Sequence, residues 1–425
     1  MTEVHTLPNG VRVALLPRPA LRTAVVSVFV RAGSVHESRV DNGISHVLEH
    51  MAFKGTRTRS VHRVNLDAER LGAEVNAHTD KDHTAYEMRG LAADAPAFVT
   101  MLGDIVRHAA FPADELERER EVILQEVAEV EDDPVTVAYH LFDHACWGLQ
   151  PAALPVIGQR SRIERFTRED LVAFVERRYS GANLVVAAAG GIDGDAVLRA
   201  ATAAFADLPA GVPNTVAPPL WAGGLRSRRM DAGSQVHLVM GFPVPALAED
   251  DMSAEVAAAA LGDGMSSPLL SELREKRGLV YHATCANDRF DGFGALAIEA
   301  SFAPARFAEV LQQVAALLRA QAGRTDDVDL DRARHQVVAR LWRDDERIEQ
   351  AAERAARDLF TAGRVRPVEE LVERVRAVDA AAVHEAVCRM HAAGPAVALT
   401  GALPRHAAQT ARALLGLQGR VAPGA

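Results

Sequence analysis

The chain of 425 residues is poor in cysteine. Its three cysteines, Cys146, Cys285 and Cys388, lie far apart and form no CxxC pair. An odd number of scattered cysteines argues against a disulfide framework and favours buried free thiols in a reducing compartment.

Long apolar runs and targeting signals are also missing. No apolar run reaches about 18 residues, the length that predicts a transmembrane helix. The first residues lack the basic segment and apolar core that make up a signal peptide. We therefore expect a cytoplasmic protein.

Basic residues are also fewer than acidic residues. The sequence has 47 Lys and Arg against 57 Asp and Glu, a net charge of −10, and no long basic block. Nucleic acids and anionic membranes both require a basic face, so neither is an expected partner. With 48% hydrophobic and 24% charged residues, the composition is that of an ordinary soluble globular protein.

Two halves of the chain show the same order of strand and helix patterns. A loop rich in proline and glycine at 208–224 predicts the boundary between a domain at 1–210 and one at 225–425. Paired strands followed by helices predict an α+β fold in which each domain is an antiparallel sheet packed with helices. The second half lacks the HxxEH of the first, so one half would hold the chemistry and the other would complete a cavity.

The segment ISHVLEHMAFKGT, residues 44–56, places His46, Glu49 and His50 within five positions. In a helix the two histidines lie about 40° apart, Glu49 lies about 60° to the other side of His46, and the apolar residues lie opposite. Two histidines four positions apart can bind one zinc ion, and a neighbouring carboxylate can act as a general base. HxxEH is also the signature of inverted zinc peptidases.

A helix surface that happens to carry polar residues is the alternative. His140 and His144 have the same spacing, with Asp143 between them. Spacing alone does not separate the two pairs, and such a pair is more often structural. The complete HxxEH motif distinguishes the two pairs, because the second pair has the shorter Asp143 where the motif requires a glutamate.

The stretch GISHVLEHMAFKGT resembles the zinc motif of the pitrilysin or insulinase family of metallopeptidases, in the branch of the mitochondrial processing peptidase β subunit and its bacterial homologues. LPNGVRVALLP, LGAEVNAHTDKDHTAYEM and EREREVILQEVAEVEDDP extend the resemblance along the chain. It implies a zinc endopeptidase or oligopeptidase acting on small or unfolded peptides. It also implies that the two domains form half of a clam-shell, closed by a second copy or by a related subunit.

A third zinc ligand is expected on a separate helix. The resemblance places it at Glu126 and makes Glu119 a supporting acid. From the residues alone the choice stays open, because seven glutamates crowd residues 115–131 and a charge-rich helix is usually a solvated face. The spacing of Glu119 and Glu126 does match nearly two helical turns.

The resemblance also suggests residues that bind substrate. Arg274 and Tyr281 match an Arg and Tyr element that contacts substrate backbone, and Asn76 and Ala77 match an edge strand that pairs with it. Phe53 matches a pocket residue. The alternatives are a surface arginine with a half-buried tyrosine, and a core aromatic.

Two further alternatives remain. His78, Asp80, Asp82 and His83 form a possible second metal site, but in a turn between strands we expect them to be solvated polar residues. Relatives of this fold also serve as non-catalytic partners or structural subunits. Those commonly lose part of HxxEH, and the complete motif in this chain favours the enzyme.

Overall fold

The computed structural model describes residues 2–231, 233–323 and 325–417, so the end of the second predicted domain lies outside it. The chain divides into two compact units, each discontinuous in sequence. The first contains Met1–Val127, Pro155–Val216 and Arg343–Pro367, and the second contains Ala128–Leu154, Ala217–Trp342 and Val368–Ala425. Each unit therefore includes a segment from the other predicted range, 1–210 or 225–425.

The first unit is built on a sheet of strand order β1-β2-β6-β3-β5-β4. The strands are β1 (Glu3–Thr6), β2 (Arg12–Pro17), β3 (Thr23–Val30), β4 (Glu74–Thr79), β5 (Thr84–Leu91) and β6 (Leu184–Gly190). β4 lies at one edge, paired with β5 in the register Asn76 to Glu87. The sheet is mixed, because β2 and β6 run parallel while the other pairs are antiparallel.

The prediction of an antiparallel sheet is confirmed for the other pairs of this sheet, and β2 with β6 is the exception. Neighbouring strands joined by short turns pair antiparallel, and the sequence pattern predicts that. The parallel partners, Arg12 with Val185 for example, are separated by most of the unit's chain. A pairing between such distant segments leaves no local pattern to read.

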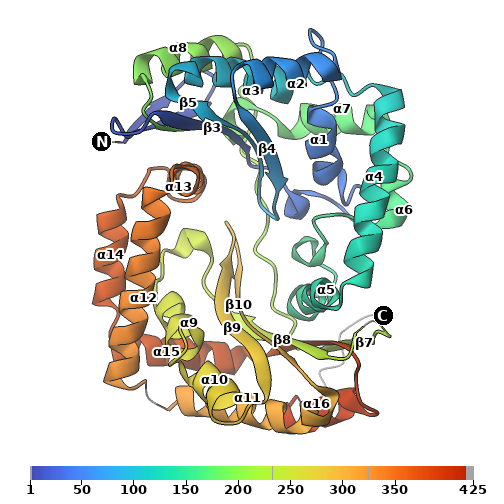
Figure 1. Ribbon diagram of the computed structural model, residues 1–425, viewed down its shortest axis with the longest axis vertical. Helices are drawn as coiled ribbons and strands as arrows, with labels where there is room; N and C mark the ends of the chain where they lie inside the picture. The colour runs from blue at the N-terminus through green and yellow to red at the C-terminus, as the bar shows by residue number, and fades with distance from the viewer. Residues whose placement is uncertain (1, 232, 324, 418–425) are drawn as a thin grey trace. The chain divides into compact units, whose positions relative to one another are not determined.

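Helices cover both faces of this first sheet (Figure 1). The helices of this unit are α1 (Ile44–Ala52), α2 (Val61–Arg70), α3 (Ala95–His108), α6 (Arg160–Ile163), α7 (Arg168–Arg178), α8 (Gly194–Phe205) and α13 (Ile348–Ala362), with short helices η1 (Ser34–His36), η2 (Ala92–Asp94) and η4 (Gly181–Asn183). Successive strand residues point to opposite faces. Val13 and Leu15 pack in the core with α1, α3, α7 and α8, whereas Ala14 and Leu16 pack against α13.

The helix α13 lies on the sheet through a stripe of small residues. Ala351, Ala352, Ala355 and Ala356 are all buried against the strands. Because both faces of the sheet are covered, β6 is buried along its whole length, and its sequence LVVAAAG is continuously apolar.

The second unit repeats this arrangement with the strand order β7-β11-β8-β10-β9. Its strands are β7 (Gly224–Arg229), β8 (Val236–Pro243), β9 (Val280–Arg289), β10 (Gly294–Phe302) and β11 (Ala396–Gly401). β7 and β11 run parallel and the rest antiparallel. Without β1, the first sheet has the same order and the same directions, so the predicted repetition of elements is present in the fold.

Helices of the second unit occupy matching places in the chain order, except α5 and η3, which precede its strands. They are α5 (Pro134–Trp147), α9 (Ser253–Gly262), α10 (Pro268–Leu270), α11 (Phe307–Gln321), α14 (Val368–Ala377), α15 (Ala380–Ala393) and α16 (Ala407–Leu415), with short helices η3 (Pro151–Ala153), η5 (Leu247–Glu249), η6 (Ser271–Glu275) and η7 (Pro304–Arg306). Two long helices, α4 (Ala113–Asp132) and α12 (Asp327–Glu346), run from one unit into the other along the chain.

Two expectations from composition can be compared with the structure. All three cysteines are thiols outside any disulfide, as expected, but only Cys146 and Cys285 are buried, whereas Cys388 is exposed. Within the described ranges, no helix is both long enough and apolar enough to cross a bilayer.

Candidate metal centre

The helix α1 begins at Gly43, which adopts a left-handed conformation with φ of 97°. A side chain there would be strained, and its Cβ would also lie 2.7 Å from Gly158 Cα. Gly43 is the N-cap residue but has no side-chain oxygen to accept hydrogen bonds from the first N–H groups of the helix. Glu37 supplies the acceptor instead, because its carboxylate accepts hydrogen bonds from the backbone N–H groups of Gly43 at 2.7 Å and Ser45 at 2.9 Å.

The two faces of α1 are as the sequence predicts. Its apolar residues are all buried in the core of the first unit: Ile44, Val47, Leu48 and Met51. His46, Glu49 and His50 lie on the other side and keep partial exposure. Burial of the apolar side thus fixes which way the three polar side chains point.

Glu126, on α4, faces both histidines of α1. Its Oε2 lies 3.7 Å from His46 Nε2 and 3.5 Å from His50 Nε2. Both separations are too long for good hydrogen bonds. Two donors each 2.0–2.1 Å from a tetrahedral zinc ion are roughly 3.4 Å apart, so the three side chains fit the spacing of a zinc ligand set.

Glu119 lies two turns before Glu126 on α4 and is only 8% exposed. Its Oε2 lies 3.1 Å from His50 Nδ1, and its Oε1 lies 2.5 Å from Lys54 Nζ. A carboxylate beside Nδ1 holds the ring proton on that nitrogen. The lone pair of His50 is then on Nε2, the nitrogen that faces Glu126. Lys54, which the sequence did not single out, balances the charge of this buried carboxylate.

Electrostatics keep His46 in the form that a metal requires. Burial, with a smaller effect from neighbouring His50, lowers the pKa of His46 to about 4. The imidazole is therefore neutral near pH 7, with a lone pair available for a cation.

Glu49 is held by the last residue of β4. Thr79 Oγ1 donates a hydrogen bond of 2.6 Å to Glu49 Oε2. Burial raises the pKa of Glu49, and the Thr79 hydrogen bond opposes that rise. No local signal links Thr79 to the motif, since 30 positions separate it from Glu49.

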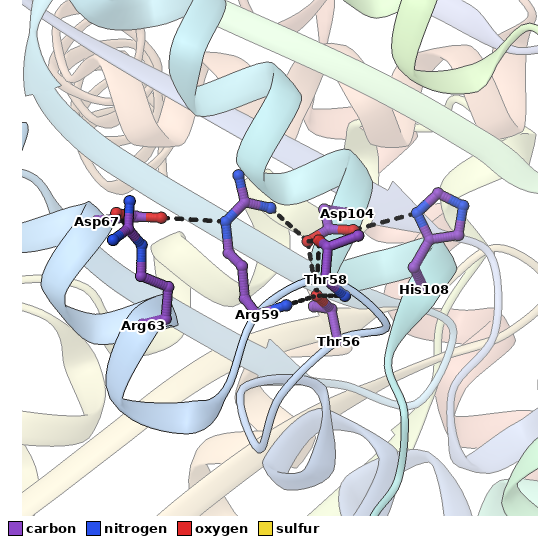
Figure 2. A network of polar contacts seen from close by, with 7 residues as sticks. All are labelled: Thr56, Thr58, Arg59, Arg63, Asp67, Asp104 and His108. Atoms are coloured by element: carbon purple, nitrogen blue, oxygen red, sulfur yellow. Dashed lines mark hydrogen bonds and ion pairs between the residues drawn. The ribbon is translucent and has the colours of Figure 1, made fainter.

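The chain that leaves α1 is anchored by the network of polar contacts in Figure 2. Asp104, on α3, accepts hydrogen bonds from the Thr56 hydroxyl at 2.8 Å and the Thr58 hydroxyl at 3.2 Å, and it pairs with Arg59. Burial of the carboxylate raises the pKa of Asp104, but these donors outweigh that effect, so its pKa lies below the usual value. The loop after the HxxEH helix is thus tied to the same core as the helix itself.

The chain matches two family models. Residues 12–160 match Insulinase (Peptidase family M16), and residues 165–337 match Peptidase M16 inactive domain. A protein named uncharacterized zinc protease from Mycobacterium tuberculosis H37Rv is 37% identical over 323 residues, which cover 75% of this chain and 74% of that protein. The chain belongs to peptidase family M16.

Further relatives agree with this membership. The mitochondrial-processing peptidase subunit beta of Lentinula edodes is 35% identical over 271 residues, which cover 63% of this M16 chain and 55% of that protein. The crystal structure of a protease from Helicobacter pylori has a TM-score of 0.84 at 21% identity, covering 94% of this chain and 99% of that one. The crystal structure of a putative M16-like peptidase from Alicyclobacillus acidocaldarius has a TM-score of 0.83 at 22% identity, covering 94% of this chain and 98% of that one. The two structures establish likeness of fold.

Among the suggested substrate residues of this M16 chain, Asn76 and Ala77 lie on the edge strand β4. Asn76 is exposed and Ala77 is partly buried. Phe53 follows α1 directly, packs on the core of the first unit, and its ring centroid is 6.3 Å from that of Tyr86. The contacts of Phe53 therefore agree with the core aromatic that the sequence left as an alternative.

Arg274 and Tyr281 lie in the second unit. Arg274 belongs to η6, a single π-helical turn, which is a local distortion that frequently occurs at functional sites. Its guanidinium carbon lies 5.5 Å from the ring centroid of Tyr281, which is 81% exposed. The alternative of a half-buried tyrosine is thus contradicted, and this phenol is open to solvent.

His140 and His144, which have the same spacing in the sequence, differ from the histidines of HxxEH in their contacts. His144 Nδ1 lies 3.1 Å from the carbonyl oxygen of Gly148 at the end of α5. Within the described residues, neither histidine belongs to a group of three or more side chains able to hold a metal ion.

Proposed function

We propose that this chain is a zinc-dependent endopeptidase or oligopeptidase that hydrolyses small or unfolded peptides. The observation that carries the proposal is the convergence of His46, His50 and Glu126 at ligand spacing. Relatives named zinc proteases support zinc as the ion. In this assignment His46, His50 and Glu126 are the metal ligands and Glu49 is the general base.

When bound, zinc supplies a Lewis acid that polarises the substrate carbonyl and makes water a stronger nucleophile. Glu49 accepts a proton from water and passes it to the leaving amine. Thr79 holds the Glu49 carboxylate in place, and Glu119 orients His50 through Nδ1. Both are positioning residues, since each acts through another side chain.

Substrate is bound through its backbone in this proposal. An extended peptide adds to the edge strand β4 beside Asn76 and Ala77. Arg274 and Tyr281 donate hydrogen bonds to the peptide carbonyl as it gains negative charge. The exposed Tyr281 phenol and the π-helical turn at Arg274 support this part, and Phe53 is assigned to the substrate pocket on the family resemblance alone.

The assembly is part of the same proposal. A second copy of the chain closes the clam-shell around the substrate, and a related subunit is the alternative partner. An enclosed chamber admits small or unfolded peptides and excludes folded proteins. We place the enzyme in the cytoplasm, which agrees with cysteines that form no disulfide.

Zinc content and turnover test the proposal together. We expect about one zinc ion per chain at the HxxEH site and cleavage of a quenched fluorescent peptide that stops with a chelator and returns with zinc. A zinc-loaded, folded protein that cleaves none of a diverse peptide library would instead support a non-catalytic subunit of the same fold. Light scattering at the assay concentration measures whether a dimer forms.

A further inference from the structure

A second group of side chains of the types that can bind a metal ion lies in the first unit, at the turn between β4 and β5. The sequence suggested that these turn residues are solvated, but His83 is only 2% exposed and Asp82 only 3%. His83 Nε2 lies 3.3 Å from His78 Nε2. Two imidazole nitrogens thus face each other at the separation of two ligands on one ion, roughly 3.4 Å for a tetrahedral zinc site.

Asp82 orients the buried imidazole. Its Oδ1 lies 2.7 Å from His83 Nδ1, and the two side chains are almost fully buried together. A carboxylate on Nδ1 leaves the lone pair on Nε2, pointing toward His78. The pairing is the same as that of Glu119 with His50 in the candidate metal centre.

Glu353 supplies the third donor from α13. One of its carboxylate oxygens and one ring nitrogen from each of His78 and His83 all lie within 4.8 Å of one another. The carboxylate is partly exposed and reachable by an ion. Arg357 Nη1 lies 3.9 Å from Glu353 Oε1. At that distance Arg357 does not occupy the carboxylate with a hydrogen bond.

We propose that His78, His83 and Glu353 form a second metal site, with Asp82 orienting His83. Two imidazoles and one carboxylate select a transition-metal ion such as Zn²⁺ over Ca²⁺ or Mg²⁺, which prefer oxygen ligands. The ion ties α13 to the end of the edge strand β4, one residue before Thr79. Its role is structural, because it cross-links two segments that are separated by most of the chain.

Zinc stoichiometry and thermal stability test this site without reference to peptidase activity. The metal-free protein is titrated with ZnCl₂, and bound zinc is measured by elemental analysis after desalting. Wild type is expected to bind two ions, and His50→Ala one. Because an ion that binds only the folded state stabilises it, zinc is expected to raise the Tm of His50→Ala as well.

Variants of the second site separate its ion from the first. His78→Asn and Glu353→Gln each leave the buried His83 and Asp82 intact and are expected to bind one ion. Adding either change to His50→Ala is expected to leave none and to abolish the zinc-dependent rise in Tm. His62→Ala, which removes an exposed histidine on α2, is the matched control and is expected to keep both ions.

Two results would overturn the proposal. One is a folded His50→Ala protein that binds no zinc and shows no rise in Tm. The other is a second ion that survives both His78→Asn and Glu353→Gln, or that disappears in His62→Ala. Circular dichroism of each variant confirms that loss of the ion is not loss of the fold.

Discussion

Thr79 Oγ1 donates a 2.6 Å hydrogen bond to Glu49 Oε2, and so joins the end of the edge strand β4 to the glutamate of the HxxEH helix. One strand thus carries the proposed peptide-binding edge and also holds the proposed base. A substrate that pairs with β4 would lie along the same strand that fixes Glu49.

Thr79→Val removes this donor while keeping the shape of the side chain. A hydrogen bond to a charged group contributes about 1.5–3 kcal/mol, so we expect kcat to fall about tenfold or more. Zinc content is expected to stay unchanged, because Glu49 is not a ligand. Thr79→Ser restores the hydroxyl and is expected to restore most of kcat, whereas equal loss in both variants would show that packing is responsible.

Glu49→Gln and His50→Ala separate the base from the ligand. Glu49→Gln is expected to keep zinc at the HxxEH site and to lose peptide turnover by at least 100-fold, within the usual range for general acid–base catalysis of about 10²–10⁴. His50→Ala is expected to lose that zinc together with activity. Retained turnover in Glu49→Gln removes Glu49 from the base role, and zinc retained at this site in His50→Ala refutes the ligand assignment.

Tyr281→Phe and Arg274→Lys test substrate binding by the second unit. The phenylalanine lacks the phenol donor, and lysine lacks the fork of the guanidinium. We expect each change to lower kcat/KM about tenfold, the effect of roughly 1.4 kcal/mol, with unchanged zinc content. Arg277→Lys, at an exposed arginine of the same segment, is the matched control and is expected to retain wild-type kcat/KM.

Glu37 predicts a dependence of stability on pH. Burial raises its pKa from 4.5 to about 7, although hydrogen bonds from Gly43, Ser45 and Asn42 oppose the rise. Between these values the folded protein retains a proton that the unfolded chain has released. The contribution of Glu37 to the free energy of unfolding therefore falls as pH rises from 4.5 to 7, by at most about 3 kcal/mol.

Glu37→Gln removes the titrating group and isolates this effect. The Tm of zinc-free wild type, relative to that of Glu37→Gln at the same pH, is expected to fall between pH 5 and pH 7.5. Asp41→Asn, at a carboxylate in the same loop, serves as the control for general charge effects. A Tm difference between wild type and Glu37→Gln that does not change with pH contradicts the prediction.

The fold and the site were predictable to different degrees. Local spacing predicts the α1 helix, its buried face and the direction of His46, Glu49 and His50. The order of strand and helix patterns predicts the internal repetition, which appears as one strand order in both sheets once β1 is set aside. Glu126 was assigned through family resemblance, because the seven glutamates of its segment have no local feature that singles one out.

Local sequence determined which side chains of a helix or strand share a face, because successive side chains turn by about 100° in a helix and about 180° in a strand. Tertiary structure decided which distant segments meet. It paired β2 with β6, laid α13 on the first sheet, brought Thr79 to Glu49, and buried His83 beside Asp82 in a turn where water was expected. Such contacts depend on which surfaces exclude water together, and that is a property of the whole packed unit.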